Sequence, residues 1–210
     1  MSENNTYSQI LETIMKNRRS VRNFSSEKPA PAQIEKIILA GLNAPFAAAA
    51  VGDRNDFRRF FIIKSDSAAR KELELIALSH LKVTLKKLNS LPARIMGVTK
   101  KLAKLIERLE NAKLPNAPYI IIIAELNGIP PVAPQALAHA AENMWLATSA
   151  EGLGFQLLSM FETMKENKAL CKLLDIKPGE YSLLGCAIGI PMEKYGPVVR
   201  PDLKTLTKWL

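Results

Sequence analysis

The fold is decided by the run Tyr119-Ile120-Ile121-Ile122-Ile123-Ala124. This run is short, β-branched and apolar on both faces, which is typical of a strand buried in the middle of a sheet. Phe57–Lys64 and Tyr181–Ile190 are also expected to be strands, and Phe155–Met160 is expected to be a short strand or an extended turn. The strands alternate with helical segments, so we read the chain as one domain, residues 1–210, with no internal repeat.

Helices are indicated by apolar residues at helical spacing. A first helix with one buried face is expected to end near Asn17. Gly152 and Gly154 are expected to close, as left-handed caps, the long buried helix that starts at Pro134. The apolar residues of the first helix are Tyr7, Ile10, Leu11, Ile14 and Met15, and the remaining expected helices cover residues 31–42, 67–89, 92–112 and 162–174.

Three arginines and a serine lie within five residues in the stretch Asn17–Phe24. If this stretch is extended, Arg18, Ser20 and Arg22 point one way, while Arg19 and Val21 point the other. Guanidinium and hydroxyl groups suit a phosphate, so one hypothesis is an anion-binding site for a phosphorylated ligand. The alternative is that these cations only complement the dipole at the end of the first helix, and composition alone favours it.

The charge of the chain is +9, and about seven of these charges lie in residues 64–113, with twelve Lys or Arg against five Asp or Glu. Such a block is typical of nucleic-acid or anionic-surface binding, of solvated helices, or of a field that attracts an anionic cofactor. Aromatic residues make up 6% of the chain and do not alternate with these lysines, which argues against a single-strand binding surface.

The sequence indicates a cytoplasmic protein. The first nine residues are polar, unlike a signal peptide, and no stretch approaches the length of a membrane helix. Cys171 and Cys186 lie among apolar residues without metal-type spacing, so we expect buried, reduced thiols. The tail, residues 192–210, is too apolar at Val198-Val199 and Trp209-Leu210 to be a free end, and we expect it to cover another surface.

Side chains typical of common catalytic sites are missing from the sequence. No G-x-G-x-x-G or G-x-S-x-G occurs, which leaves a Rossmann site, a P-loop and a nucleophile elbow unsupported. The two histidines, His80 and His139, lack neighbours at metal-ligand spacing, except that Glu142 follows His139 by three residues. An anion site without catalytic side chains suits a bound cofactor that carries the chemistry.

Four segments together resemble the FMN-dependent nitroreductase family. Arg18–Phe24, after a first helix, resembles the family's opening signature, and Ala40–Pro45 resembles the end of its second helix. Ala141–Ala147, followed by Gly152-Leu153-Gly154, resembles its central helix, and Leu184–Pro191 resembles its last core strand. The order and spacing agree over most of the chain, excepting residues 65–113.

This resemblance implies an α+β fold in which helices flank a mixed, mainly antiparallel sheet. It implies an intertwined homodimer with the flavin at the interface, the central helix at the dimer core, and the tail 192–210 reaching over the partner. Residues 65–113 would form a helical insert or a cationic lid. In this family a hydride passes from NAD(P)H to N5 of FMN and then to a nitro compound, quinone or similar acceptor, in ping-pong fashion.

The resemblance also assigns cofactor-binding residues, with no catalytic side chain and no metal. Arg18, Arg19 and Ser20 would hold the FMN phosphate and ribityl chain. Arg22 would lie near the pyrimidine edge, where a cation stabilises reduced flavin. Four further residues complete the set: Leu158 and Ser159 near N5 of the ring, and Arg200 and Lys204 as tail cations for the phosphate.

One loop departs from the family pattern. The family follows its Ala-Pro with serines, an asparagine and Gln-Pro-Trp, whereas this chain has Phe46–Ala50 and then Asn55–Arg58. This difference supports an alternative hypothesis, an FMN- or anion-binding protein without efficient turnover. A third hypothesis, a nucleic-acid or anionic-surface binder, rests on the +9 charge and predicts an affinity that falls steeply with salt.

Overall fold

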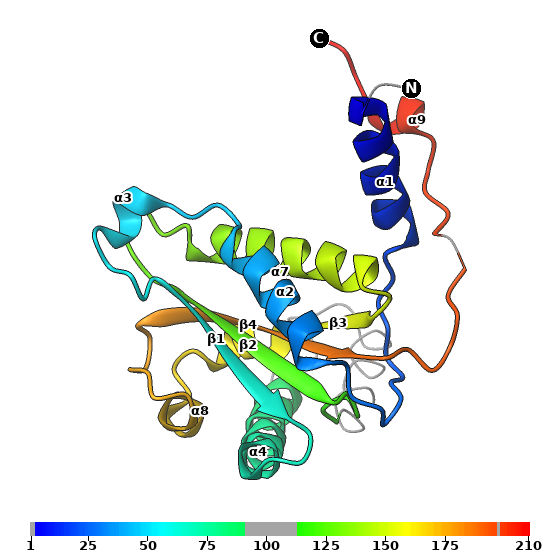
Figure 1. Ribbon diagram of the computed structural model, residues 1–210. Helices are drawn as coiled ribbons and strands as arrows, with labels where there is room; N and C mark the ends of the chain where they lie inside the picture. The colour runs from blue at the N-terminus through cyan, green and yellow to red at the C-terminus, as the bar shows by residue number, and fades with distance from the viewer. Residues whose placement is uncertain (1–2, 91–112, 197) are drawn as a thin grey trace.

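The computed structural model describes residues 3–90, 113–196 and 198–210. Within these residues, four strands form one sheet in the order β1-β2-β4-β3, and all neighbouring strands are antiparallel (Figure 1). An isolated bridge from Ser20 to Phe155 is parallel. The strands are β1 (Arg58–Lys64), β2 (Tyr119–Leu126), β3 (Gly154–Leu158) and β4 (Tyr181–Gly189). The run 119–124 therefore lies in a central strand, as expected.

Strand β2 contributes to two separate hydrophobic cores. Every residue of β2 is buried. Ile121 and Ile123 belong to one core, whereas Ile120 and Ile122 belong to the other. Successive side chains of a strand point to opposite faces of the sheet. A strand with no polar face in its first six residues is therefore what a sheet covered on both sides requires.

Helices cover both faces of the sheet. In Figure 1, α2 and α7 lie on one face, and α4 and α8 lie on the other. The helices are α1 (Glu3–Asn17), α2 (Pro31–Leu42), α3 (Ala48–Val51), α4 (Ala68–Ser90), α7 (Ala133–Ala150), α8 (Lys168–Leu173) and α9 (Leu203–Leu206), with a 3-10 helix, η1, at Ser159–Met164. The predicted α+β class, with a mainly antiparallel sheet flanked by helices, is confirmed.

Several helix ends follow their sequence signals. The Ser67 hydroxyl accepts a hydrogen bond from the Arg70 amide at 3.1 Å, at the start of α4. The predicted helix at 162–174 is wrong as one element, because η1 ends at Met164 and α8 begins at Lys168. The Asn167 side chain caps the N-terminus of α8 by accepting a hydrogen bond from the Leu170 amide at 3.0 Å.

The two glycines after α7 have different roles. Gly152 has a φ of +70°, the left-handed conformation expected after a helix. The prediction that Gly154 is also a cap is wrong, because Gly154 is the first residue of β3. An added Cβ at Gly154 would lie 2.8 Å from the Cβ of Val21, so the missing side chain allows Val21 to pack against the strand.

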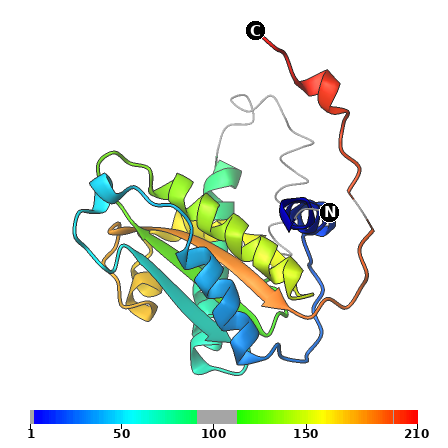
Figure 2. The same cartoon turned by 45° about the horizontal axis from the view of Figure 1, so that its top comes forward.

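The chain does not cover its own first helix or its tail. We expected α1 to bury one face, but Tyr7, Ile10, Leu11 and Met15 are exposed, Tyr7 by 68%, and only Ile14 is partly buried. The end of the tail does not wrap over this chain either, and Trp209 is 97% exposed. Figure 1 shows α1 extending away from the sheet, and Figure 2 shows the same for the tail. Helical spacing reports that a face is apolar, but it does not report whether the same chain buries that face.

The helix predicted over residues 92–112 lies outside the described residues. No helix of the described part is long and apolar enough to cross a membrane.

Candidate functional site

The arginine stretch is extended along the outer edge of β3. The Val21 amide donates a hydrogen bond to the Phe155 carbonyl at 2.9 Å, next to the bridge between Ser20 and Phe155. Val21 itself is buried against Gly154. Residues 18–22 are therefore held at a fixed place on the sheet, and their longer side chains are available for other contacts.

Arg18 lies against α7. Its guanidinium forms an ion pair with Glu142 and lies over the ring of Trp145, 4.6 Å from the ring centroid. The Trp145 indole N–H donates a hydrogen bond to the Arg19 carbonyl at 3.2 Å, and the indole stacks on Phe155 at 4.9 Å. Sequence reasoning missed this pair, because Arg18 and Glu142 are 124 residues apart.

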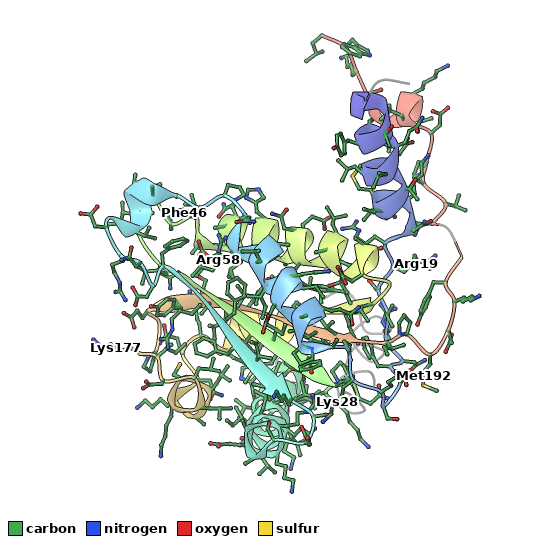
Figure 3. The ribbon with its side chains drawn as sticks, viewed as in Figure 1. Arg19, Lys28, Phe46, Arg58, Lys177 and Met192 are labelled. Atoms are coloured by element: carbon green, nitrogen blue, oxygen red, sulfur yellow. The ribbon has the colours of Figure 1, made fainter. Side chains whose placement is uncertain are left out.

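Arg19 contacts the start of the tail. It donates a hydrogen bond to the Gly196 carbonyl, and its guanidinium lies 5.8 Å from the centroid of the Tyr195 ring. The tail runs beside the arginine stretch here, because the Met192 amide bonds to the Asn23 carbonyl at 3.1 Å. Figure 3 shows Arg19 between the end of α1 and this part of the tail.

The expected alternation of the stretch agrees with these contacts. Trp145, beneath Arg18, packs against the core of α2 and α7. Tyr195, beside Arg19, packs against the opposite core, to which Val21 also belongs. Arg22 is exposed. Arg18 thus contacts α7, whereas Arg19 contacts the start of the tail.

The remaining predicted site residues lie at two other places. Leu158 ends β3 and is buried, whereas Ser159 begins η1 and is exposed. Leu158 lies about 10 Å along β3 from Phe155, the residue bridged to the arginine stretch, at 3.3 Å per residue, and Ser159 directly follows it. Arg200 and Lys204 are exposed in the tail, and within the described residues no hydrogen bond or ion pair joins either of them to the arginine stretch.

The loop after α2 carries an aromatic pair. Phe46 stacks on Phe57, with ring centroids 3.9 Å apart and planes at 19°. A shallow pocket of about 220 Å³ beside this pair is lined by residues that include Phe46, Val132 and His139. The short helix α3 follows in the alanine run.

Arg58 is buried and donates hydrogen bonds to the backbone of this loop. It forms a bidentate ion pair with Glu125, at 2.6 and 3.1 Å, and both side chains are buried. It also donates to the carbonyls of Gly41 and Ala44 at 2.9 Å and of Pro45 at 3.2 Å (Figure 3). Burial raises the pKa of the Glu125 carboxyl, and the bonds to Arg58 oppose that rise. Sequence reasoning missed this role of Arg58, although Glu125, a carboxylate directly after the apolar run 119–124, was a signal for its partner.

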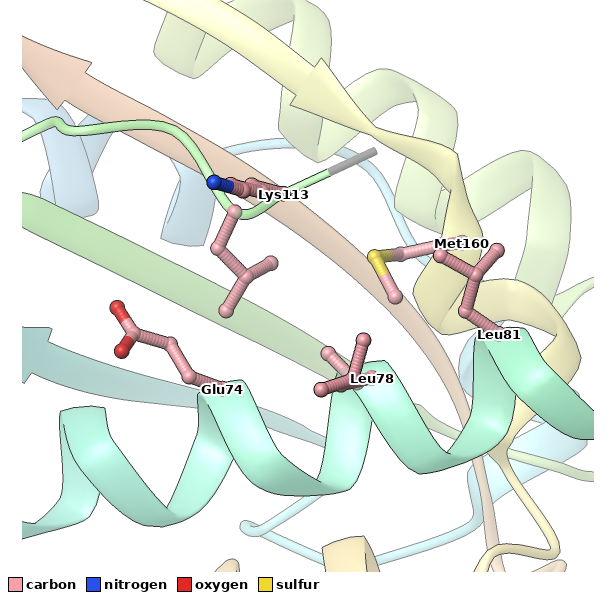
Figure 4. Close-up of a pocket in the computed structure, with 7 residues that line it drawn as sticks. Glu74, Leu78, Leu81, Lys113 and Met160 are labelled. Atoms are coloured by element: carbon pink, nitrogen blue, oxygen red, sulfur yellow. The ribbon is translucent and has the colours of Figure 1, made fainter. Parts of the chain in front are cut away.

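A second pocket, larger than the one beside Phe46, lies elsewhere, between α4, Leu114 and Met160 (Figure 4). It has a volume of about 410 Å³ and an apolar lining, with Glu74 and Lys113 among its residues. None of the predicted site residues lines it. Because α4 and Lys113 adjoin residues 91–112, which are outside the described part of the chain, the pocket is assigned no ligand.

Comparison with known proteins places this geometry in a family. The model of the nitroreductase family matches residues 15–190, which is most of the chain. A search of curated proteins found no match.

Solved structures share the fold at low sequence identity. A nitroreductase with bound FMN from Bacteroides fragilis NCTC 9343 has a TM-score of 0.69 and 17% identity, with 95% of this chain and 98% of that chain covered. A nitroreductase with bound FMN from Desulfitobacterium hafniense DCB-2 has a TM-score of 0.67 and 18% identity, with 96% and 98% covered. A BluB-like flavoprotein from Clostridium difficile 630 has a TM-score of 0.70 and 18% identity, with 95% and 98% covered.

Proposed function

Because the chain belongs to the nitroreductase family, we propose that it is an FMN-dependent oxidoreductase. The observation that carries this proposal is the arginine stretch 18–22, which is fixed to the edge of β3 and presents guanidinium groups and a hydroxyl. The solved structures with bound FMN support the same cofactor.

The residues fit the charge of FMN. Arg18, Arg19 and Ser20 bind the phosphate and ribityl chain, since a guanidinium fork and a hydroxyl match phosphate oxygens. Arg22 places a cation at the pyrimidine edge. Two further pairs complete the proposed site: the backbone of Leu158 and Ser159 at the ring near N5, and the cations Arg200 and Lys204 for the phosphate.

The proposed reaction takes a hydride from NAD(P)H and delivers it to a nitro compound, a quinone or a similar acceptor, in ping-pong fashion. When bound, FMN supplies this redox chemistry through its N5 atom. The protein contributes binding, orientation and positive charge. The cationic residues in the arginine stretch stabilise the negative charge that builds up on reduction.

The proposed assembly is a homodimer with the flavin at the interface. The exposed apolar residues of α1 and of the tail support it, because clusters of exposed apolar side chains mark interaction surfaces. In this arrangement the tail reaches over the partner subunit, which provides a route for Arg200 and Lys204 to a site. We also expect a cytoplasmic location, in keeping with the two free thiols Cys171 and Cys186.

The test is the visible spectrum of the purified protein before and after addition of FMN, followed by anaerobic mixing with NADH or NADPH. We expect flavin absorption that co-elutes with the protein and is bleached by the nicotinamide, then restored by a quinone or nitro compound. A chain that neither retains nor binds FMN contradicts the proposal.

A second candidate function is FMN binding without efficient turnover. It is supported by the loop Phe46–Ala50, where an aromatic residue and alanines replace the polar residues of the family pattern. Under this alternative the protein binds FMN, but NAD(P)H does not reduce the flavin at ordinary enzyme rates. The same anaerobic mixing experiment therefore decides between the two functions.

A further inference from the structure

Two residues of α7 fix the position of the Arg18 guanidinium. Glu142 holds it from the side through an ion pair, and Trp145 supports its face at 4.6 Å. Trp145 is itself fixed, because it stacks on Phe155 and donates to the Arg19 carbonyl. The position of Arg18 thus depends on α7, and through Trp145 on β3 and the arginine stretch.

The ion pair leaves part of the guanidinium available. One nitrogen, Nη1, donates to one carboxylate oxygen of Glu142. The Arg18 side chain is 24% exposed and that of Glu142 is 43% exposed, so the pair reaches solvent. A guanidinium has five N–H donors, and a second anion can therefore bind to Arg18 while Glu142 remains in contact.

We propose that Glu142 is a positioning residue that orients Arg18 for the phosphate of the flavin. This inference rests on the proposed function. An arginine that is already oriented loses less side-chain freedom when a phosphate binds, so the affinity for the phosphate increases. The carboxylate also offsets one positive charge, so its benefit comes from orientation and not from added attraction.

Because Arg18 is proposed to bind the phosphate, loss of Glu142 should affect binding of the phosphate and not of the ring. Riboflavin has the ring and the ribityl chain of FMN but no phosphate. Loss of Glu142 should therefore weaken FMN binding and leave riboflavin binding unchanged, which a general loss of folding would not do.

The experiment measures the dissociation constants of FMN and riboflavin for wild type, E142A, E142Q and R18A, with urea unfolding as a check on folding. E142Q preserves the shape of the side chain if E142A folds poorly. E151Q is the matched control, because Glu151 directly follows α7 and pairs with Lys36 at 3.0 Å, away from the arginine stretch.

We expect E142A to raise the FMN dissociation constant by up to about tenfold, which corresponds to the cost of ordering one long, flexible side chain on binding. E142Q should show a smaller rise, and E151Q none. The double variant R18A/E142A should bind FMN no more weakly than R18A, because Glu142 acts through Arg18.

Other results overturn the inference. Tighter FMN binding by E142A would mean that Glu142 competes with the phosphate, and equal losses for FMN and riboflavin would mean a merely structural role. No change in either constant would remove Glu142 from the site. If wild type binds neither ligand, the proposed function fails together with this inference, which the wild-type titration reveals before any variant is compared.

Discussion

Arg58 and Glu125 are direct partners across β1 and β2, and they form an ion pair whose side chains are 0% and 2% exposed. The remaining donors of Arg58 bond to the carbonyls of Gly41, at the end of α2, and of Ala44 and Pro45, in the loop that follows it. One side chain thus joins the sheet, α2 and the loop that carries Phe46.

Replacement of Arg58 should therefore be costly. We expect R58M to lower the free energy of unfolding by about 3–5 kcal/mol, because it leaves a buried carboxylate without a partner. The double variant R58M/E125L should recover part of this loss. It should not reach wild type, since the carbonyls of Gly41, Ala44 and Pro45 still lose the hydrogen bonds from Arg58. Urea unfolding monitored by circular dichroism measures each difference.

The control for this prediction is the neighbouring residue in the same strand. Arg59 is only partly buried and donates to the Asp175 carbonyl at 3.2 Å. R59M should cost no more than about 1 kcal/mol. If R58M and R59M lowered the free energy of unfolding equally, the buried Arg58–Glu125 pair would not contribute more to stability than a partly buried arginine does.

A second prediction concerns acid. Hydrogen bonds from the Arg54 guanidinium and the Tyr181 hydroxyl hold the pKa of Asp56 below its ordinary value of 3.8. A depressed carboxyl pKa stabilises the folded state above the unfolded-state value, and this stabilisation is lost as the pH falls below about 4. At pH 7, D56N should therefore unfold at a lower urea concentration than wild type. The difference between the two urea midpoints should become smaller as the pH is lowered.

Asp53, in the same loop, provides the comparison for Asp56. D53N removes the same charge, so it controls for the net charge of the chain. Urea midpoints at several pH values between 7 and 3 measure both variants. A gap between D56N and wild type that is constant across this range would contradict the prediction.

A third prediction tests Arg22. If its charge stabilises the reduced flavin, R22A should slow flavin reduction by NAD(P)H about tenfold, and R22K should lose less because it keeps the charge. Anaerobic stopped-flow absorbance measures the rate. K28A is the control, since Lys28 is an exposed cation that pairs with Asp66 at 2.7 Å. A similar slowing in K28A would mean that net charge, and not position, is responsible.

A fourth prediction tests the dimer. L11E places a charge on the apolar face of α1, and Q9E places the same charge almost on the opposite side of the helix. If α1 packs on a second copy, L11E should sediment as a monomer and lose flavin, whereas Q9E should behave as wild type. Sedimentation velocity decides, and a wild-type monomer would contradict the proposed assembly.

Local features of the fold could be predicted because local sequence determines them. The apolar run in β2, Ser67 before α4 and the left-handed Gly152 all behave as expected. The break between η1 and α8 was missed, since the cap by Asn167 competes with apolar spacing that continues through it. The exposure of α1 could not be predicted, because spacing does not identify what packs on a face.

The candidate site could be predicted in part for the same reason. The alternation of Arg18 and Arg19 follows from an extended backbone. Their partners do not: Glu142 is 124 residues away from Arg18, and Gly196 is 177 residues away from Arg19. Such pairings depend on how elements that are distant in the sequence pack together, and a single sequence does not show this packing.

The central position of β2 has a practical consequence for every stability measurement. Tyr119–Ala124 combines high β-propensity with no charge and no proline, the signature of a segment that aggregates when it is exposed. Pro118 and Glu125 flank it as gatekeepers, and β1 and β4 shield its edges. Heating should therefore precipitate the unfolded chain irreversibly, and most readily in variants that replace Glu125. Chemical denaturation, which keeps the unfolded chain dissolved, is accordingly the method of choice for comparing these variants.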